Sequence, residues 1–224
     1  MRFSLATVGL RHALEALAPV TQVSNSYVDH GTRTVSWQSY TPGFQRGVYY
    51  PLEYQFLLDR QQYSVLLSDG SFFQFYYSFG KTDKLEQARL AFYPRPISTV
   101  DEAGDLFDAA EAALDRSDDG LFDHLYNWAE YLEEKKGAPV NTSHVRMDYD
   151  HKVEVHAKSH LQLGAVQEFR LPADFFPLPV AFVELCGGLL DKQVVATPPS
   201  LRFAKKNLLS LHRTASLICL GSLI

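Results

Sequence analysis

The part of the sequence best suited to chemistry is a group of charged and imidazole side chains between residues 145 and 163. Segment 145–150 alternates apolar and polar residues, so as a strand it would place Arg146, Asp148 and Asp150 on one face. A returning strand over residues 160–163 would place His160 and Gln162 on one face in the same way. If the two strands pair, the charged side chains and His160 converge on one polar face.

Three interpretations of this group are open. Asp148, Asp150 and His160 combine two carboxylates with an imidazole, a ligand set suited to a divalent metal ion. Such an ion would activate water for phosphodiester cleavage while Arg146 holds a phosphate. Without a metal, His156 and His160 would serve as general acid and base. The third interpretation is structural: an Arg–Asp salt bridge on a solvated sheet face, with exposed histidines.

Other catalytic signatures do not occur in the sequence. It has no Walker A motif, no GxGxxG, no HExxH and no G-x-S-x-G. The two cysteines, Cys186 and Cys219, form no CxxC, which favours buried thiols in a reducing compartment over disulfides or zinc. A divalent metal is therefore the one cofactor that the residues suggest.

Strands that would position these side chains are predicted in several segments. The clearest is 62–79, where two alternating runs flank Asp69-Gly70, a dipeptide typical of a two-residue hairpin turn with positive φ at both positions. Residues 20–40 predict two strands around a turn at Gly31. Further strands are predicted at 89–93, 144–150 and 160–171.

Helices are predicted where apolar residues recur at helical spacing. The segments are 10–17, which ends before Pro19, then 103–114, 121–132 and 182–190, while 203–220 fits either a helix or a strand. Thr99 and Glu102 have the spacing of a capping box, and Asp118 and Asp119 are candidate caps of the 121–132 helix. Together these elements predict an α+β fold: an antiparallel β-sheet with a two-helix insertion and terminal helices. Residues 1–224 would form a single domain, with the helical insertion at 98–137.

Composition predicts a cytoplasmic protein outside the membrane. The chain of 224 residues is 46% hydrophobic, enough for a substantial core. The start of the chain lacks the pattern of a signal peptide. The apolar tail 214–224 is shorter than the roughly twenty residues of a membrane span. We interpret the tail as a buried terminal element or a contact surface for a partner.

The net charge of −5 is unevenly distributed. Residues 101–136 have twelve acids and three bases, and the rest of the chain has fourteen acids and eighteen bases. Between residues 192 and 213 there are five bases and no acid. This pattern fits a solvated acidic helical face, or an acidic arm for a basic partner and a body that touches phosphate. It lacks the strong basic excess of a dedicated nucleic-acid binder.

Three blocks of sequence resemble a bacterial family of unknown function, DUF2290. They are Tyr63–Ser71 (YSVLLSDGS), Ala88–Pro94 (ARLAFYP) and Arg146–Asp150 (RMDYD) followed by His156, His160 and Gly164. The resemblance implies an accessory gene of mobile and anti-phage defence regions. The third block is also similar, more loosely, to a toxin family of toxin–antitoxin pairs. Where DUF2290 tends to have His-His-Pro, this chain has Val155-His156-Ala157.

The resemblance and the missing catalytic signatures favour a binding or assembly component of a bacterial anti-phage defence or toxin–antitoxin system. Its expected partner is another protein subunit or a second copy of the chain, and nucleic acid is a further candidate. The alternative is a metal-dependent or histidine-dependent nuclease or phosphodiesterase. Its candidate catalytic residues are Arg146, Asp148, Asp150, His156 and His160.

Overall fold

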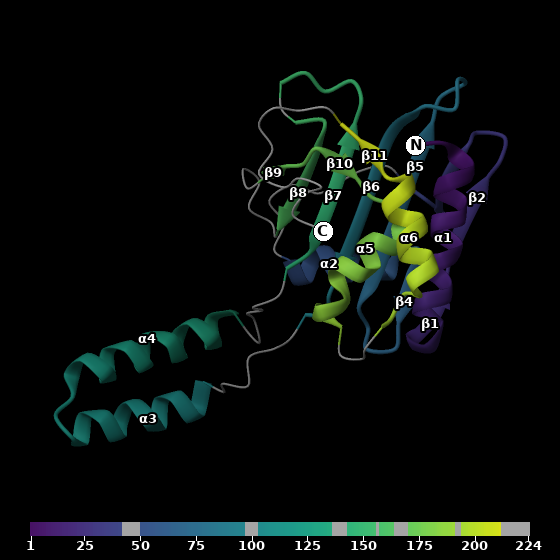
Figure 1. Ribbon diagram of the computed structural model, residues 1–224. Coiled ribbons are helices and arrows are strands. Elements are labelled where there is room, and N and C mark those ends of the chain that lie inside the picture. The colour runs from purple at the N-terminus through teal and green to yellow at the C-terminus, as the bar shows by residue number, and fades with distance from the viewer. Residues whose placement is uncertain are drawn as a thin grey trace. The chain divides into compact units, whose positions relative to one another are not determined.

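The computed structural model describes residues 1–41, 50–96, 103–135, 143–155, 157–163, 170–190 and 194–211 (Figure 1). The chain divides into two compact units. The sheet unit consists of Met1–Arg95 and Ser143–Ile224, and the helical unit is Pro96–Thr142. The α+β prediction is confirmed, because a large antiparallel sheet combines with helices, two of which form the insertion.

All strand pairs in the large sheet are antiparallel. The strands follow the order β1 (Thr21–Ser24), β4 (Val65–Leu67), β5 (Phe72–Phe79), β6 (Leu85–Tyr93), β7 (Val145–Asp150), β8 (Ser159–Leu163) and β9 (Arg170–Pro172). In addition, β2 (Ser26–Asp29) pairs with β3 (Thr34–Trp37), and β3 pairs with β5. A separate two-stranded sheet joins β10 (Phe175–Phe176) and β11 (Leu209–Ser210).

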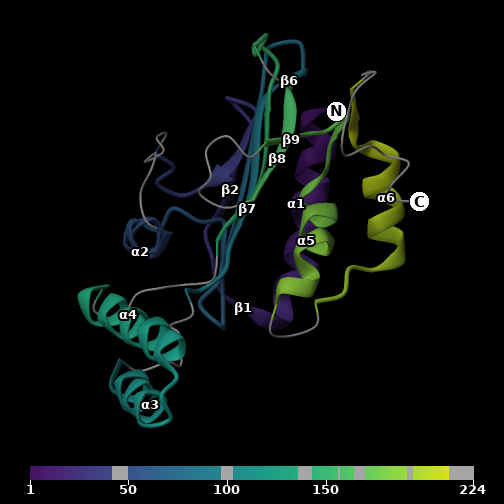
Figure 2. The same cartoon turned by 90° about the vertical axis from the view of Figure 1, so that its left-hand side faces the viewer.

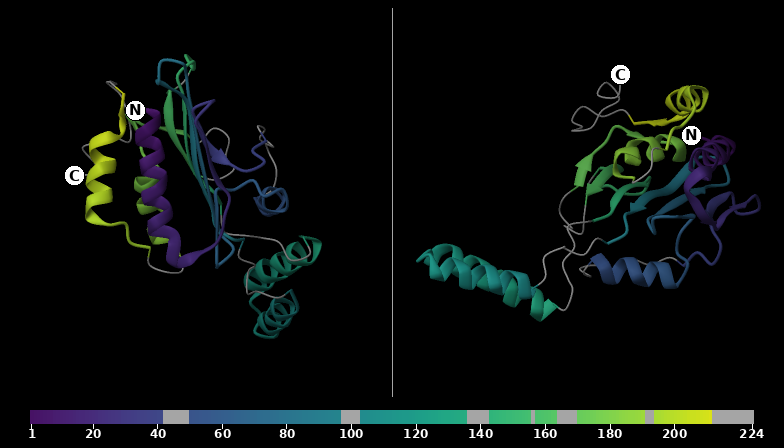
Figure 3. Two further views of the ribbon diagram at one scale, coloured as in Figure 1. Left: turned by 90° about the vertical axis from the view of Figure 1, so that its right-hand side faces the viewer. Right: turned by 90° about the horizontal axis from the view of Figure 1, so that it is seen from below.

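The first face of the sheet carries the main core. Alternation along β5 places Phe73, Phe75, Tyr77 and Phe79 in the buried hydrophobic cluster. Two helices cover this face, α1 (Phe3–Leu17) and α5 (Pro179–Cys186), and α6 (Pro198–Asn207) packs on their outer side (Figures 2 and 3). Burial of each large apolar side chain here contributes about 1.5–3 kcal/mol to stability.

The second face of the sheet is covered in part by α2 (Tyr50–Asp59), which lies on the opposite side from α1, α5 and α6 (Figure 2). The ring of Tyr54 contacts Phe72, and the ring of Tyr50 stacks parallel to Tyr93. The Tyr50 hydroxyl donates to the carbonyl of Pro94 at 2.5 Å. This aromatic contact fixes α2 against the ends of β5 and β6.

Two of the predicted turn and strand details are wrong. In the Asp69-Gly70 turn, only Gly70 has a positive φ. The Gly70 N–H donates to the Leu67 carbonyl, and the Leu67 N–H donates to the Ser71 carbonyl. This is a three-residue loop closed by a glycine in the left-handed region, and the Asp69 carboxylate accepts from the Ser71 N–H at 2.8 Å. Residues 20–40 form three strands, since β1 pairs with β4 before β2 and β3 form their hairpin.

The helix predicted at 10–17 begins earlier, at Phe3, and the segment predicted at 160–171 contains two strands, β8 and β9, in its described part. Other predicted elements agree more closely with the structure. Segment 182–190 corresponds to α5 and the 3-10 helix η2 (Gly187–Leu189), and a second 3-10 helix, η1 (Ala18–Val20), follows α1. Segment 203–220, left open between helix and strand, contains the end of α6 and β11 in its described part. The predicted capping box at Thr99 and Glu102, Cys219 and the tail 214–224 lie outside the described residues.

The helical unit is a pair of helices, α3 (Ala103–Asp115) and α4 (Asp119–Lys135), that pack against each other. The predicted cap is present, because the Asp118 carboxylate accepts from the Leu121 N–H at 3.1 Å. The described side chains buried in this unit are Ala110, Ala113, Ala129 and Leu132. Among the helices that the structure describes in the whole chain, none has the length and apolar character to cross a membrane.

Candidate functional site

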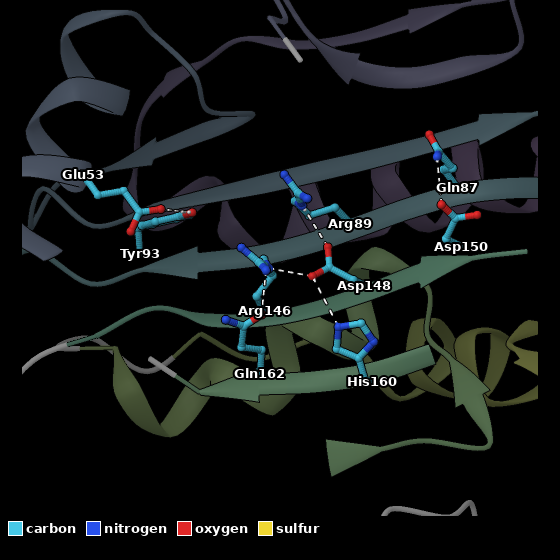
Figure 4. A network of polar contacts seen from close by, with 9 residues as sticks. All are labelled: Glu53, Gln87, Arg89, Tyr93, Arg146, Asp148, Asp150, His160 and Gln162. Atoms are coloured by element: carbon cyan, nitrogen blue, oxygen red, sulfur yellow. Dashed lines mark hydrogen bonds and ion pairs between the residues drawn. The ribbon is translucent and has the colours of Figure 1, made fainter. Parts of the chain in front are cut away.

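The candidate site is a polar network on the second face of the sheet, across β6, β7 and β8 (Figure 4). In the strand register, Asp148 lies directly between Arg89 on β6 and His160 on β8. Arg146 lies two residues before Asp148 and is the register partner of Gln162. Alternation along β7 therefore puts Arg146 and Asp148 on the same face, as the sequence pattern predicted.

Asp148 is the centre of the network. Its Oδ1 accepts a hydrogen bond from Arg89 Nε at 2.9 Å, and its Oδ2 accepts one from Arg146 Nε at 2.6 Å. Arg146 Nη2 also donates to Gln162 Oε1 at 2.6 Å. His160 Nε2 lies 3.8 Å from Asp148 Oδ2, which is an ion-pair distance and too long for a hydrogen bond.

Burial makes these charges strongly dependent on one another. The side chains of Arg146 and His160 are 7% and 8% exposed, that of Asp148 is 18% exposed and that of Arg89 is 35% exposed. Burial by itself would raise the pKa of Asp148, but the charges of Arg89 and Arg146 outweigh it and hold the pKa at about 2. Asp148 is therefore ionised at neutral pH and holds both guanidinium groups in fixed orientations.

One predicted site residue that the structure describes, Asp150, is not part of this contact group. Asp150 shares the face of Asp148, but its carboxylate accepts from the side chain of Gln87 at 3.0 Å and from the backbone N–H of Lys152 at 2.9 Å. It therefore lies at one end of the polar row (Figure 4). His156 lies outside the described residues.

The described residues do not fit the predicted metal site. Nowhere in the described ranges do three His, Cys, Asp or Glu side chains form a group that could hold a metal ion. Asp148 directs both oxygens at guanidinium groups, and Asp150 is bonded to Gln87. The ligand set Asp148, Asp150 and His160 stays a prediction that this part of the chain does not support.

The sequence pattern missed a second polar group beside the network. Tyr93 on β6 donates its hydroxyl to Glu53 Oε1 at 3.2 Å, and His144 Nδ1 lies 3.6 Å from Glu53 Oε2. All three residues are buried, and burial raises the pKa of Tyr93. One signal was present: Glu53 lies between Tyr50 and Tyr54, so a helix here would bury a carboxylate beside two aromatic rings.

The arrangement can recognise an anion more readily than a cation. Two planar guanidinium groups, which match the oxygens of carboxylates and phosphates, are held at one carboxylate by adjacent strands. Arg89 is the most exposed member, so a ligand from solvent would meet it first. The fold and site together define an antiparallel-sheet protein with a buried arginine–aspartate network on the face opposite its main helices.

Comparison with known proteins gives the family. A family model described as Uncharacterized conserved protein (DUF2290) matches residues 19–187, and the chain belongs to this family. The match runs from η1 to the end of α5 and includes the whole polar network and the helical unit. Searches of curated proteins and of solved structures found no match.

Proposed function

We propose that this protein is a binding component that takes a phosphate-bearing ligand on the second face of its sheet, with Arg89 in direct contact with the phosphate and Arg146 as a second positive charge beneath it. The supporting observation is the convergence of both guanidinium groups on Asp148, at 2.9 Å and 2.6 Å. These three groups alone carry a net charge of +1. In a largely buried setting, such a group favours an anion.

The contacts of Arg146 suggest how the two arginines divide the work. Arg146 is held by Asp148 and by Gln162, and only a small part of its side chain is exposed. It would act as a fixed positive charge below the ligand. Arg89, which is about a third exposed, would make the direct contact from the solvent side. Because both are already oriented by Asp148, binding would cost little side-chain reorganisation.

Calorimetric titration tests this proposal, with a short single-stranded RNA and inorganic phosphate as probes at low and at raised salt. Arg89→Gln is expected to weaken binding about tenfold or more, and salt should weaken wild-type binding because phosphate contacts release counterions. Arg89→Lys keeps the charge but loses the planar fork, so its affinity should lie between those of wild type and Arg89→Gln. The matched control is Arg11→Gln, which changes an exposed arginine on α1.

Two results would contradict the phosphate site. One is a wild-type protein that binds neither probe at low salt. The other is an Arg89→Gln protein that binds as tightly as the Arg11→Gln control. Circular dichroism of each variant separates loss of the ligand contact from loss of the fold, since Arg89 also bonds to Asp148.

A second candidate function is metal-independent phosphodiester cleavage. The observation that favours it is the position of His160, whose Nε2 lies 3.8 Å from the ionised Asp148 carboxylate. An imidazole beside a carboxylate can act as a general acid or base, and the arginines would hold the phosphate. Cleavage by wild type but not by His160→Gln, with RNA binding retained, would support this candidate. Binding of RNA without any cleavage product would rule out this candidate and leave phosphate binding as the proposed function.

The setting that we propose, a bacterial anti-phage defence or toxin–antitoxin system, is supported only by the family resemblance. Growth of bacteria on induced expression tests it, with wild type compared with His160→Ala and Asp148→Asn at matched soluble levels. Growth arrest by wild type alone would support a toxin that uses this site. Normal growth in all three cases would exclude a stand-alone toxin. A role as an assembly component of a defence system would then be tested by phage challenge.

A further inference from the structure

The helical unit has large apolar side chains on its surface. Leu114, in the last turn of α3, is 51% exposed, and Leu121, in the first turn of α4, is 37% exposed. They flank the short turn between the helices. Three of the four buried side chains described in this unit are alanines, which bury little area. Exposed leucines of this kind mark an interaction surface.

The surroundings of the two leucines specify the charge of their partner. Residues 101–136 have twelve acids and three bases. Glu111 and Asp115 are exposed one turn apart on α3, and Asp118 and Asp119 follow at the turn. We call Leu114, Leu121 and these four acids the helical tip. A partner of the helical tip must offer apolar side chains next to basic ones.

The sheet unit has such a surface on α5, η2 and α6. Leu185, Leu189 and Val195 are 52%, 57% and 63% exposed. A side chain at Gly187 would lie 3.9 Å from the Val194 carbonyl, so the segment before α6 passes beside the start of η2. Helix α6 packs against α5 and α1, on the side of these helices that faces away from the sheet (Figures 2 and 3).

The basic half of this surface is on α6. Arg202, Lys205 and Lys206 are exposed, and their spacing of three and four residues places them on one side of the helix. Residues 192–213 have five bases and no acid. We call the three apolar side chains and these three bases the α5–α6 surface. It has the apolar and basic groups that the helical tip requires.

We infer that the helical tip of one copy docks on the α5–α6 surface of a second copy, and the reverse, in a two-fold symmetric dimer. One chain carries both complementary surfaces, so a reciprocal contact covers both apolar patches in each copy. The opposite charges bring the surfaces together and set their register, and the leucines supply the apolar contact. This inference goes beyond the phosphate site and does not depend on it.

Sedimentation of the full chain over a range of concentrations tests the dimer. Wild type is expected to be in a monomer–dimer equilibrium whose dissociation constant rises with salt. Lys205→Glu/Lys206→Glu should raise the dissociation constant about tenfold or more, and so should Glu111→Lys/Asp115→Lys. The chain with all four changes exchanges the charges between the surfaces and should regain most of the wild-type affinity. Lysines in the last turn of α3 also suit the helix dipole, so the helical unit should stay folded.

Two further variants separate the contact from general charge effects. Lys81→Glu/Lys84→Glu makes the same charge change in the β5–β6 turn and should leave the dissociation constant unchanged. Leu114→Ser/Leu121→Ser removes the apolar part of the helical tip without touching its acids, and should weaken the dimer at all salt concentrations.

Several results would overturn the inference. They are a wild-type monomer at every concentration, a dimer insensitive to the changes on α6, and a four-fold variant with no recovery of affinity. A monomer that binds a polylysine peptide through Glu111 and Asp115 would also overturn it, because the helical tip would then be assigned to a separate basic partner.

Discussion

Replacing Asp148 by asparagine tests whether its charge holds the polar network together. The two guanidinium groups lower the pKa of Asp148 from its ordinary value of 3.8 to about 2, against the opposing effect of burial. A pKa difference of this size corresponds to about 2 kcal/mol in favour of the ionised form. Asp148→Asn keeps the shape but removes the charge and leaves Arg146 largely buried. We expect the free energy of unfolding at pH 7 to fall by about 2–4 kcal/mol.

The stabilisation that Asp148 provides should decrease as the pH falls. Because the pKa in the folded state is lowered, the stabilisation is complete above the ordinary pKa of 3.8 and is lost as pH falls through about 2. At pH 3 roughly half of the charge contribution, about 1 kcal/mol, should remain. Urea unfolding at pH 7 and pH 3, followed by circular dichroism, measures the difference between wild type and variant.

Asp150→Asn is the matched control, since Asp150 lies on the same face and strand but is bonded to Gln87 and a backbone N–H. It should change the stability by about 0.5 kcal/mol or less. A cost of Asp148→Asn no larger than that of the control would refute the central role of this carboxylate. So would a difference from wild type that is the same at pH 7 and pH 3.

Three further predictions concern the main core. Tyr77→Phe removes the buried hydroxyl that donates to the Pro177 carbonyl at 2.8 Å, and should cost about 1–2 kcal/mol in urea unfolding; no loss would mean that the carbonyl finds another donor. Gly9→Ala would place a methyl group 3.0 Å from Leu178 Cβ, so α1 must move away from α5, and thermal unfolding should show a loss of about 1 kcal/mol. Burial raises the pKa of the Cys186 thiol, so mass spectrometry should find its peptide unlabelled by iodoacetamide in the native protein and labelled in urea, and rapid native labelling would show that α5 opens.

The parts of the fold that follow from local pattern were predictable from sequence. Alternation along β5 and helical spacing in α3 and α4 each reflect a single buried face, so the elements could be placed within a few residues. The turn at Gly70 was not predictable in this way, because its conformation depends on which residues close the β4–β5 pair. Helix α2 was also missed: its buried residues include Glu53, which breaks the apolar pattern.

The candidate site was predictable only within one hairpin. Arg146, Asp148 and His160 come from β7 and β8, which are neighbours in sequence, so alternation alone placed them on one face. Arg89 is 59 residues from Asp148, and only the pairing of β6 with β7 brings them together. A pattern with period two cannot show which distant strand lies alongside. The metal prediction was made without Arg89. In the structure, Asp148 accepts hydrogen bonds from Arg89 as well as Arg146, so this carboxylate pairs with two cationic side chains of the protein.

The pairing of β6 with β7 also predicts the result of removing the helical unit. Tyr93 ends β6, Val145 begins β7, and Phe92 is the register partner of Val145, so the two strands already meet where the helical unit is inserted. Replacing Pro96–Thr142 by a Gly/Ser linker of about six residues should leave a simple hairpin connection and change the stability of the sheet unit by about 1 kcal/mol. The shortened chain should keep the Arg89-dependent binding of RNA and lose the dimer. A shortened chain that still dimerises would contradict docking through the helical tip, and one that folds but no longer binds RNA would move the ligand site to the helical unit.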